Sequence, residues 1–302
     1  MARTEAGQPR AGGPRVWLRA TRPQTLSASV VPVLVGSATA TQLGAFHIGL
    51  FVATLAAALL IQIGSNLAND YFDFRNGKDT AARLGPARVT QSGQLAPKTV
   101  KRATVLVLVL AAVVSIPVVL TGGWAILIAG LACIAAAVLY TGGPWPFGYH
   151  ALGDLGAFLF FGPVGVCGTA YVQAGLLTRG SVLNALPVGF LIAAILVVNN
   201  LRDIDTDRAV AKRTLAVLLG RRATRAEYVL LLLAAFLVPL ARWLLHPSLH
   251  WFWLPWLTLP LALLVTRAVL RDEGRKLNQA LARTAQLNLL FGAAYALSLL
   301  PR

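Results

Sequence analysis

Charged residues are scarce in this chain of 302 residues: Asp, Glu, Lys and Arg together make up 13% of it, about half the share of a soluble domain. Apolar residues make up 57%, and the mean hydropathy is +0.67. This balance excludes a water-soluble globule, a disordered chain and a fibrous repeat. Because the apolar residues form continuous runs, the sequence predicts an all-α, polytopic membrane protein.

Cysteine and histidine are also rare, and neither is spaced as a metal site. The only two cysteines, Cys133 and Cys167, lie inside apolar runs and form no CxxC pair, so we expect buried free thiols. The four histidines show no metal-ligand spacing. The sequence also contains no GxSxG, P-loop or GxGxxG motif, which argues against the hydrolases and nucleotide-binding proteins that use them.

Nine apolar runs are long enough to cross a bilayer, for which about 20 residues are needed. They are residues 25–43, 47–67, 103–121, 123–141, 152–173, 182–200, 226–245, 249–267 and 284–300. We therefore expect nine transmembrane helices in one domain over residues 25–302, preceded by a basic arm over residues 1–24. Within the arm, residues 15–22 are expected to form a short interfacial helix, with Trp17 at the headgroup level.

The basic residues are distributed unevenly between the two expected sides of the membrane. All but three of the 27 Lys and Arg residues fall in the arm or after the second, sixth and eighth runs; the exceptions are Arg179, Arg242 and Arg302. Since cytoplasmic loops carry most Lys and Arg, we expect a multi-pass protein of the cell (plasma) membrane, with a cytoplasmic N-terminus and the C-terminus opposite. The net charge of +16 then reflects topology and an anionic bilayer surface, and requires no nucleic-acid partner.

Acidic residues number only 11, and more than half of them gather in two clusters at the cytoplasmic ends of expected spans. Asn66, Asp70 and Asp73 close the second run at spacings of i, i+4 and i+7, which places them on one helix face. Asp203 and Asp207 close the sixth run at i, i+4, and likewise share a face. Both acidic motifs are therefore expected on the cytoplasmic side.

Like charges stacked on a helix near a bilayer are unfavourable unless something compensates them. Mg²⁺ takes oxygen ligands and commonly bridges carboxylates to phosphate, so two facing clusters predict a Mg²⁺–diphosphate site. Solvated helix ends with Asp–Arg pairs, a cation-coupled transporter and a lipid-binding scaffold are the alternatives. A transporter should carry polar groups at mid-span, and the third, seventh and eighth runs carry almost none, which favours an enzyme with a half-lipid substrate.

These segments resemble the motifs of the UbiA superfamily of intramembrane prenyltransferases, and most closely its MenA branch, the 1,4-dihydroxy-2-naphthoate polyprenyltransferases. The resemblance covers about residues 16–300. Asp79 follows Asp73 by six positions, whereas the hydroxybenzoate branch has a shorter gap, and this favours the naphthoate branch. The motifs are Arg22-Pro-Gln-Thr-Leu, Asn66-x-x-Asn-Asp70-Tyr-Phe-Asp73, Gly77-x-Asp79, Gly85-Pro-Ala-Arg88-Val-Thr90-Gln-Ser92-Gly93, Tyr140-Thr-Gly-Gly143, Ala151-Leu-Gly-Asp154, Asn199-Asn-Leu-Arg202-Asp203-Ile-Asp-Thr-Asp207 and Lys212-Arg213-Thr-Leu.

The resemblance implies nine helices around a central cavity with a lateral opening to lipid. It implies Mg²⁺-dependent transfer of a polyprenyl group from polyprenyl diphosphate to an aromatic acid. In the MenA branch the acceptor is 1,4-dihydroxy-2-naphthoate, the carboxyl group leaves as CO₂, and the product is demethylmenaquinone, a precursor of menaquinone. Hydroxybenzoate and homogentisate are the alternative acceptors.

Site roles follow from the resemblance and from the chemistry of the side chains. Mg²⁺ on the diphosphate is expected to bind Asn66, Asp70, Asp73, Asp203 and Asp207. Phosphate oxygens are expected to contact Arg75, Lys78, Arg202 and Lys212. The acceptor is expected near Arg88, Thr90, Gln91, Ser92, Tyr140 and Asn199. Asp154 either takes the phenolic proton or caps a helix, and the sequence weighs the two equally.

Overall fold

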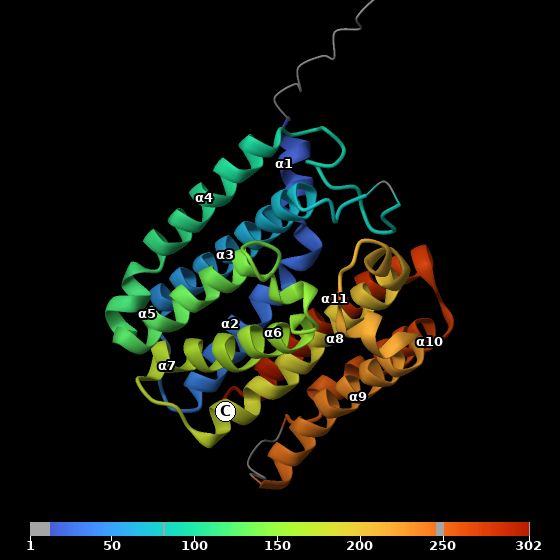
Figure 1. The fold of residues 1–302 in the computed structure, drawn as a ribbon. Coiled ribbons are helices and arrows are strands. Elements are labelled where there is room, and N and C mark those ends of the chain that lie inside the picture. The colour runs from blue at the N-terminus through green and yellow to red at the C-terminus, as the bar shows by residue number, and fades with distance from the viewer. Residues whose placement is uncertain (1–12, 81, 246–250, 302) are drawn as a thin grey trace, which may run out of the picture.

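The computed structural model describes residues 13–80, 82–245 and 251–301, and the regular elements of this part of the chain are all helices (Figure 1). The long helices run roughly antiparallel to their neighbours in one bundle. They are α1 (Pro14–Thr21), α2 (Ser27–Thr41), α3 (Ile48–Arg75), α4 (Pro97–Val114), α5 (Ile116–Leu139), α6 (Gly153–Leu159), α7 (Gly168–Ala174), α8 (Arg179–Ala209), α9 (Leu215–Leu245), α10 (Leu259–Arg271) and α11 (Leu277–Ser298). Short turns complete them: η1 (Pro23–Thr25), η2 (Phe147–Tyr149), the π-helix η3 (Phe160–Cys167), η4 (Leu254–Thr258) and η5 (Gly274–Lys276).

Six helical segments of the described chain are long and apolar enough to cross a membrane. They are Ile48–Arg75, Ile116–Leu139, Gly153–Ala174, Arg179–Ala209, Leu215–Leu244 and Leu254–Arg271. This confirms a multi-pass, all-α membrane protein, while the number of nine spans stays a prediction. The first twelve residues of the basic arm, and the first two of the expected span 249–267, lie outside the described residues.

A break in α5 accounts for part of the difference between the six membrane-length helices of the structure and the nine predicted spans. Gly123 has φ 63° and ψ −154°, so the helix stops there and a second one begins. A residue with a side chain is strongly disfavoured in this conformation, and glycine adopts it readily. The break coincides with the turn predicted between runs 103–121 and 123–141. The first turns of α5 therefore continue the direction of α4, and the remainder forms the returning helix.

Helix α8 is the centre of the bundle, and it packs against α9, α11, α6 and η3 (Figure 1). Two-thirds of its most apolar stretch is buried, a larger share than in the other five membrane-length helices. Val188, Leu191 and Val198 from α8 are fully buried against Tyr228 of α9 and Phe291 of α11. Burial of side chains of this size stabilises a protein by about 1.5–3 kcal/mol each in water. The core thus fixes the end of α8 that carries the second acidic cluster.

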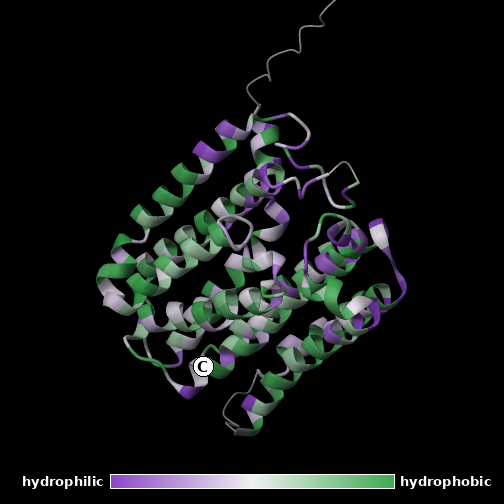
Figure 2. Cartoon of the chain, viewed as in Figure 1, coloured by the Kyte–Doolittle hydropathy of each residue, from purple (hydrophilic) through white to green (hydrophobic). Residues whose placement is uncertain are grey.

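The expected helix over residues 15–22 is present as α1, although its place at a membrane interface stays a prediction. Trp17 and Ala20 pack in one apolar cluster with Leu67 of α3, so α1 is held beside the first acidic cluster. Figure 2 shows hydrophobic residues along the outer helices, whereas hydrophilic residues concentrate in the loop after α3 and at the nearby helix ends. The polar chemistry of the molecule is therefore gathered at one end of the bundle.

Candidate active site

One large cavity, of about 1110 Å³, connects the two acidic clusters. It begins between the ends of α3 and α8 and extends along α5 and η3, so that a polar head continues into an apolar arm. The structure brings ten of the predicted site residues into its wall: Asn66, Asp70, Asp73, Arg88, Tyr140, Asn199, Arg202, Asp203, Asp207 and Lys212. Six others, all among the described residues, do not line it: Arg75, Lys78, Thr90, Gln91, Ser92 and Asp154.

Asp73 is the most heavily bonded carboxylate of the site. Its Oδ2 lies 2.5 Å from Arg88 Nη2, and its Oδ1 lies 3.2 Å from Lys212 Nζ. The Tyr149 hydroxyl donates a hydrogen bond to the same Oδ1 at 2.5 Å. Two cations from loops and one neutral donor from η2 therefore converge on one buried carboxylate at the end of α3.

The electrostatics of the loop residues follow from this arrangement. Burial alone would lower the pKa of Arg88, but the surrounding carboxylates, led by Asp73, raise it above its usual value. Burial, together with the charge and hydrogen bond of Asp73, raises the pKa of Tyr149. Tyr149 therefore keeps its proton and acts as a donor, and Lys212 Nζ lies 5.0 Å above the centre of its ring.

Asp70 anchors the loop that follows α3. Its two carboxylate oxygens accept hydrogen bonds from the backbone N–H groups of Val89 and Thr90, each at 3.1 Å. This holds residues 88–90 against the helix and aims the Arg88 side chain at Asp73. Thr90 is buried beside this anchor, whereas Ser92 points outward and is exposed.

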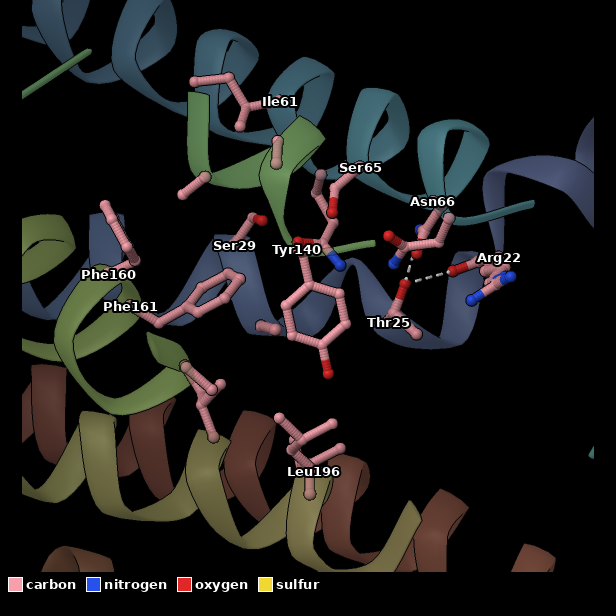
Figure 3. Close-up of a pocket in the computed structure, with 18 of the residues that line it drawn as sticks. Arg22, Thr25, Ser29, Ile61, Ser65, Asn66, Tyr140, Phe160, Phe161 and Leu196 are labelled. Carbon is pink, nitrogen blue, oxygen red and sulfur yellow. Dashed lines mark hydrogen bonds between the residues drawn. The ribbon is translucent and has the colours of Figure 1, made fainter. Parts of the chain in front are cut away.

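Asn66 ties the first acidic cluster to the N-terminal segment. Its Nδ2 donates to the Thr21 carbonyl and to Thr25 Oγ1, both at 2.9 Å, as Figure 3 shows for Thr25. The amide nitrogen is thereby fully engaged, whereas the amide oxygen of this cavity-lining residue accepts no hydrogen bond from the described residues. An oxygen in this position has the chemistry of a Mg²⁺ ligand.

The second cluster is organised around Arg202, which is 2% exposed. Its guanidinium makes two bonds to Asp203, at 2.8 and 2.5 Å, and further bonds to the side-chain oxygens of Asn199 and Asn278, each at 2.8 Å. Asn278 comes from α11, a contact that no motif in the sequence indicated. Asp205 does not line the cavity; it is exposed and pairs with the half-buried Arg221.

Lys78 and Arg75 lie just outside the cavity wall. Lys78 donates to the carbonyl oxygen of Val210 and so ties the loop after α3 to the loop after α8. Arg75 is exposed at the end of α3. Lys78 therefore links two loops beside the site in this structure, and its contact with phosphate stays a prediction.

The two alternatives for Asp154 are resolved in part. The residue that precedes α6 at the capping position is Leu152, so Asp154 is not the helix cap. Its oxygens accept hydrogen bonds from Asn200 Nδ2 at 3.2 and 3.5 Å, and Asn200 lines the cavity. Asp154 thus reaches the cavity through Asn200, while the ring of Tyr140 lies inside it, between Ser29 and Leu196 (Figure 3).

Arg22, Arg83 and Tyr149 are among the cavity residues that sequence reasoning missed. Arg22 sits in the left-handed region, with φ 50°, and points into the cavity beside Asn66 (Figure 3). Burial, with repulsion from Arg88 and Arg83, lowers the pKa of Arg22 to about 9, and its Nη2 has no hydrogen-bond partner among the described residues. Burial also lowers the pKa of Arg83. Arg22 opens one motif of the resemblance, which was the available signal.

The donor set fits Mg²⁺ in chemistry, because Asn66, Asp70, Asp73, Asp203 and Asp207 offer only oxygen atoms to one cavity. Within the described ranges, no three acidic, histidine or cysteine side chains already converge as a preformed cage. Asp73 and Asp203 are instead held by Arg88, Lys212 and Arg202. Magnesium generally binds with its own waters and substrate phosphates, so a cage of protein atoms is not needed.

Comparison with known proteins identifies the family. Residues 29–291 match the model of the UbiA prenyltransferase family. The chain is 37% identical over 294 residues to the 1,4-dihydroxy-2-naphthoate octaprenyltransferase of Escherichia coli K12, covering 94% of this chain and 95% of the relative. The same enzyme of Mycobacterium tuberculosis H37Rv is 37% identical over 281 residues, covering 93% of this chain and 95% of the relative.

A solved structure agrees in fold. It is described as a UbiA homolog from Archaeoglobus fulgidus bound to DMAPP and Mg²⁺, and it superposes with a TM-score of 0.66 at 15% identity, covering 94% of this chain and 98% of that one. At this identity the likeness establishes the architecture alone. Together with the match over most of the chain, it shows that the protein belongs to the UbiA prenyltransferase family.

Proposed function

We propose that this chain transfers a polyprenyl group from polyprenyl diphosphate to 1,4-dihydroxy-2-naphthoate, with loss of diphosphate and CO₂. The product is demethylmenaquinol, the reduced form of demethylmenaquinone on the route to menaquinone. The observation that carries this proposal is one shared cavity, in which both acidic clusters and six Arg or Lys residues open into an apolar arm. A diphosphate with a long hydrocarbon tail is complementary to such a cavity, and two bacterial relatives are named for this acceptor.

The donor's head would bind between the ends of α3 and α8. Asn66, Asp70, Asp73, Asp203 and Asp207 would hold Mg²⁺ there, and the metal would supply positive charge to balance the departing diphosphate. Arg88 and Lys212 would exchange Asp73 for phosphate oxygens, while Arg202 keeps its position through Asn199 and Asn278. Arg22, with a buried and unpartnered Nη2 among the described residues, is a further ligand for phosphate.

The chemical step is a substitution at the first carbon of the prenyl chain. The C–O bond breaks and the diphosphate leaves with its electron pair, giving an allylic cation. The ring carbon that bears the carboxylate attacks this cation, and the C–C bond to the carboxylate then breaks to release CO₂ and restore the aromatic ring. A cavity walled by Tyr140, Phe160 and Phe161 excludes water, which would otherwise capture the cation (Figure 3).

The acceptor would lie beside Tyr140 and Asn199, with its carboxylate toward Arg88. Thr90 supports this wall from behind through the backbone anchor on Asp70, and Gln91 and Ser92 continue the same loop at its rim. Asp154 has a positioning role in this arrangement, because it orients Asn200 and does not itself face the cavity.

The proposal includes a topology: nine spans, a single domain over residues 25–302, and a cytoplasmic N-terminus in the plasma membrane. The C-terminus and Thr178 would lie on the other side, and both acidic clusters on the cytoplasmic side. In a Cys133→Ala/Cys167→Ala background, Ser92→Cys should react with a membrane-impermeant thiol reagent in inverted vesicles only, and Thr178→Cys in intact cells. The reverse pattern would overturn this orientation.

A product assay tests the activity. Purified protein in detergent is given Mg²⁺, a polyprenyl diphosphate and 1,4-dihydroxy-2-naphthoate, and diphosphate, CO₂ and prenylated quinol are followed by mass spectrometry. We expect a Mg²⁺-dependent quinol product that Asp70→Ala and Asp203→Ala abolish. Turnover only with hydroxybenzoate or homogentisate would replace the acceptor, and absence of turnover from folded protein with every acceptor would reject the proposal.

A further inference from the structure

Arg179 and Arg242, two of the three basic residues that the sequence separates from the cytoplasmic groups, lie at adjoining helix ends. Arg179 is the first residue of α8, and Arg242 lies in the last turn of α9. Both helix ends lie at the end of the bundle opposite the loop that follows α3 (Figure 1). A Cβ atom added at Gly180 would lie 3.0 Å from Arg242 Nη1 and 3.3 Å from its Nη2, so the guanidinium contacts the first turn of α8.

The first turn of α8 also provides unused backbone donors. Thr178 caps the helix, and its hydroxyl accepts a hydrogen bond from the Ser181 N–H at 3.1 Å. The N–H groups of Arg179 and Gly180 have no acceptor among the described residues, as is usual for the first positions of a helix. Because a helix N-terminus carries partial positive charge, it attracts an anion and disfavours a neighbouring cation. The guanidinium of Arg242 is therefore placed where it adds to a positive charge.

Arg242 is buried, at 6% exposed, and its Nε has no hydrogen-bond partner among the described residues. The dipole of α9 favours a cation in the last turn of that helix, but such an interaction contributes at most about 2 kcal/mol. Removing an ion from water costs several kcal/mol. The helix end therefore does not offset the burial of this charge by itself.

The surrounding sequence contains no acidic side chain that would neutralise Arg242. Glu227 is the only acidic residue of α9, and it lies 15 positions earlier, about 22 Å along the helix. The acidic residues of α8 begin at Asp203, near its other end, and α2, α10, α11 and residues 246–258 contain none. The next turn of α8 is polar but neutral: Asn184 accepts from the Tyr295 hydroxyl at 2.9 Å and donates to Thr39 Oγ1 at 3.0 Å. An anion from outside the chain is the partner that is missing.

The lengths of the helices place Arg242 at the level of lipid headgroups. Helix α8 has 31 residues and is about 46 Å long, close to the roughly 40–45 Å thickness of a bilayer that includes its headgroups. Trp243, next to Arg242, stacks on Phe252, and Trp251 and Trp253 nearby are exposed. Tryptophan is enriched at this level of membrane proteins. Phospholipid phosphates are the anions that a bilayer presents there.

We propose that Arg242 and the N-terminus of α8 bind a phosphate group, which a phospholipid headgroup of the leaflet opposite the cytoplasm supplies. The planar guanidinium matches a phosphate with two parallel hydrogen bonds, and the Arg179 and Gly180 N–H groups are further donors. Neither Arg242 nor residues 178–181 line the catalytic cavity, so this site is separate from it. The proposal therefore does not depend on which acceptor the protein prenylates.

The test measures lipid binding to the whole protein in detergent, with saturating Mg²⁺ and diphosphate added to occupy the cations of the catalytic cavity. The probes are dihexanoylphosphatidylglycerol, dihexanoylglycerol, which lacks the phosphate, and glycerol 3-phosphate, which lacks the tails. We expect only the first to raise the melting temperature of the wild type. Arg242→Gln should weaken its binding at least tenfold, as expected for the loss of charge-assisted hydrogen bonds. Arg267→Gln, an exposed charge on α10, should bind like the wild type.

Two further measurements distinguish a ligand site from a structural role of Arg242. Without lipid, Arg242→Gln should melt no lower than the wild type, because it removes a buried charge that has no counter-ion. A purely structural arginine would instead lower the melting temperature when replaced. Gly180→Ala keeps the charge but places a Cβ 3.0 Å from Nη1, so it should displace the guanidinium and also weaken lipid binding.

Equal lipid affinity in the wild type and Arg242→Gln would overturn the proposal. Stabilisation by glycerol 3-phosphate that Arg242→Gln abolishes would support the phosphate site and assign it to a soluble phosphate. A third variant carries a neutral Gly-Ser tail after Arg302, a residue outside the described ranges, which moves the terminal carboxylate. Lipid binding that appears only in this variant would show that the chain's own carboxylate neutralises Arg242, and would also overturn the proposal.

Discussion

Arg88 Nη2 lies 2.5 Å from Asp73 Oδ2, with the two side chains only 7% and 2% exposed. Taking both charges out of water costs several kcal/mol per ion, which attraction within the pair offsets only when the remaining bonds are satisfied. On the carboxylate side they are, through Lys212 and Tyr149. On the guanidinium side Nε forms an ion pair with Asp79 Oδ2 at 3.4 Å, whereas Nη1 lacks a hydrogen-bond partner among the described residues. Nη1 is therefore a donor that a phosphate or a carboxylate could use.

Removing one member of this pair should cost more than removing both. Arg88→Met leaves a buried carboxylate short of its main partner, so we expect a loss of about 3–5 kcal/mol in unfolding free energy. The double variant Arg88→Met/Asp73→Asn should recover most of that loss and still be inactive. Thermal and denaturant unfolding in detergent measure this, and a double variant no more stable than Arg88→Met would contradict it.

Arg22 should make the protein more responsive to anions. Its pKa is lowered to about 9 because burial and the neighbouring Arg88 and Arg83 disfavour the charged form. At pH 7 the charge therefore costs stability, so Arg22→Gln should melt at a higher temperature than the wild type without ligand. Arg22 loses its proton at a lower pH in the folded protein than in the unfolded chain. As the pH rises from about 9 toward the higher pKa of the unfolded chain, the unfolding free energy of the wild type should therefore increase relative to that of the variant.

Diphosphate should reverse the order of the melting temperatures of the wild type and Arg22→Gln. Adding inorganic diphosphate with Mg²⁺ should raise the melting temperature of the wild type more than that of Arg22→Gln, because the anion relieves the repulsion among the arginines. Lys98→Gln, an exposed charge on α4 outside this cavity, serves as the control and should respond like the wild type. Equal shifts in wild type and Arg22→Gln would exclude Arg22 as an anion ligand.

The acidic clusters were predictable because helical spacing decides which side chains share a face. Asn66, Asp70 and Asp73 line one cavity as the pattern i, i+4, i+7 requires. The turn at Gly123 was likewise predictable, from the interruption between two apolar runs. Both features depend on local periodicity, which the sequence records directly.

Loop residues were less predictable, because no periodicity fixes where a loop side chain points. Thr90, Gln91 and Ser92 were grouped with Arg88, yet consecutive residues of a turn face different directions and only Arg88 lines the cavity. Tyr149 lies 76 positions from Asp73 in the chain, and only the tertiary fold brings its hydroxyl to that carboxylate. The π-helix η3, which carries Phe160 and Phe161 to the cavity, has no pattern of its own in the sequence.

The anchor between Asp70 and the following loop gives a separate prediction. Asp70→Ala removes both acceptors of the Val89 and Thr90 N–H groups, so residues 85–93 should detach from α3. Hydrogen exchange in this segment should accelerate, while exchange in the core of α8 should not. Asp70→Asn keeps one acceptor oxygen and should show an intermediate effect, and unchanged exchange in Asp70→Ala would contradict the anchoring role.

Arg202 should not be replaceable by lysine. Its guanidinium contacts Asp203, Asn199 and Asn278 at once, and an ammonium on a flexible stem does not satisfy three partners in one plane. We expect Arg202→Lys to lower both the melting temperature and kcat/KM, the latter by about 10- to 100-fold if one or two charge-assisted bonds are lost. Arg221→Lys, whose partner Asp205 is exposed, should change neither, because an ion pair with one solvent-exposed member contributes little.

Replacing Tyr149 distinguishes most sharply between a residue that supports catalysis and one that supports the stability of the fold. Tyr149→Phe removes the hydroxyl that donates to Asp73 but keeps the ring beneath Lys212. A hydrogen bond to a charged group contributes about 1.5–3 kcal/mol, so kcat/KM should fall about 10- to 100-fold if Asp73 must be held in place for the metal and the donor. Because a freed carboxylate still has Arg88 and Lys212, the melting temperature should change little.

The matched control is Tyr228→Phe in the core of the bundle. The Tyr228 hydroxyl bonds to Thr284 at 3.1 Å, and neither residue lines the cavity, so the same deletion should lower stability and leave kcat/KM unchanged. The two variants are then expected to behave oppositely in the two measurements. If Tyr149→Phe lost stability without losing activity, Tyr149 would be a structural residue, and the positioning of Asp73 would rest on Arg88 and Lys212 alone.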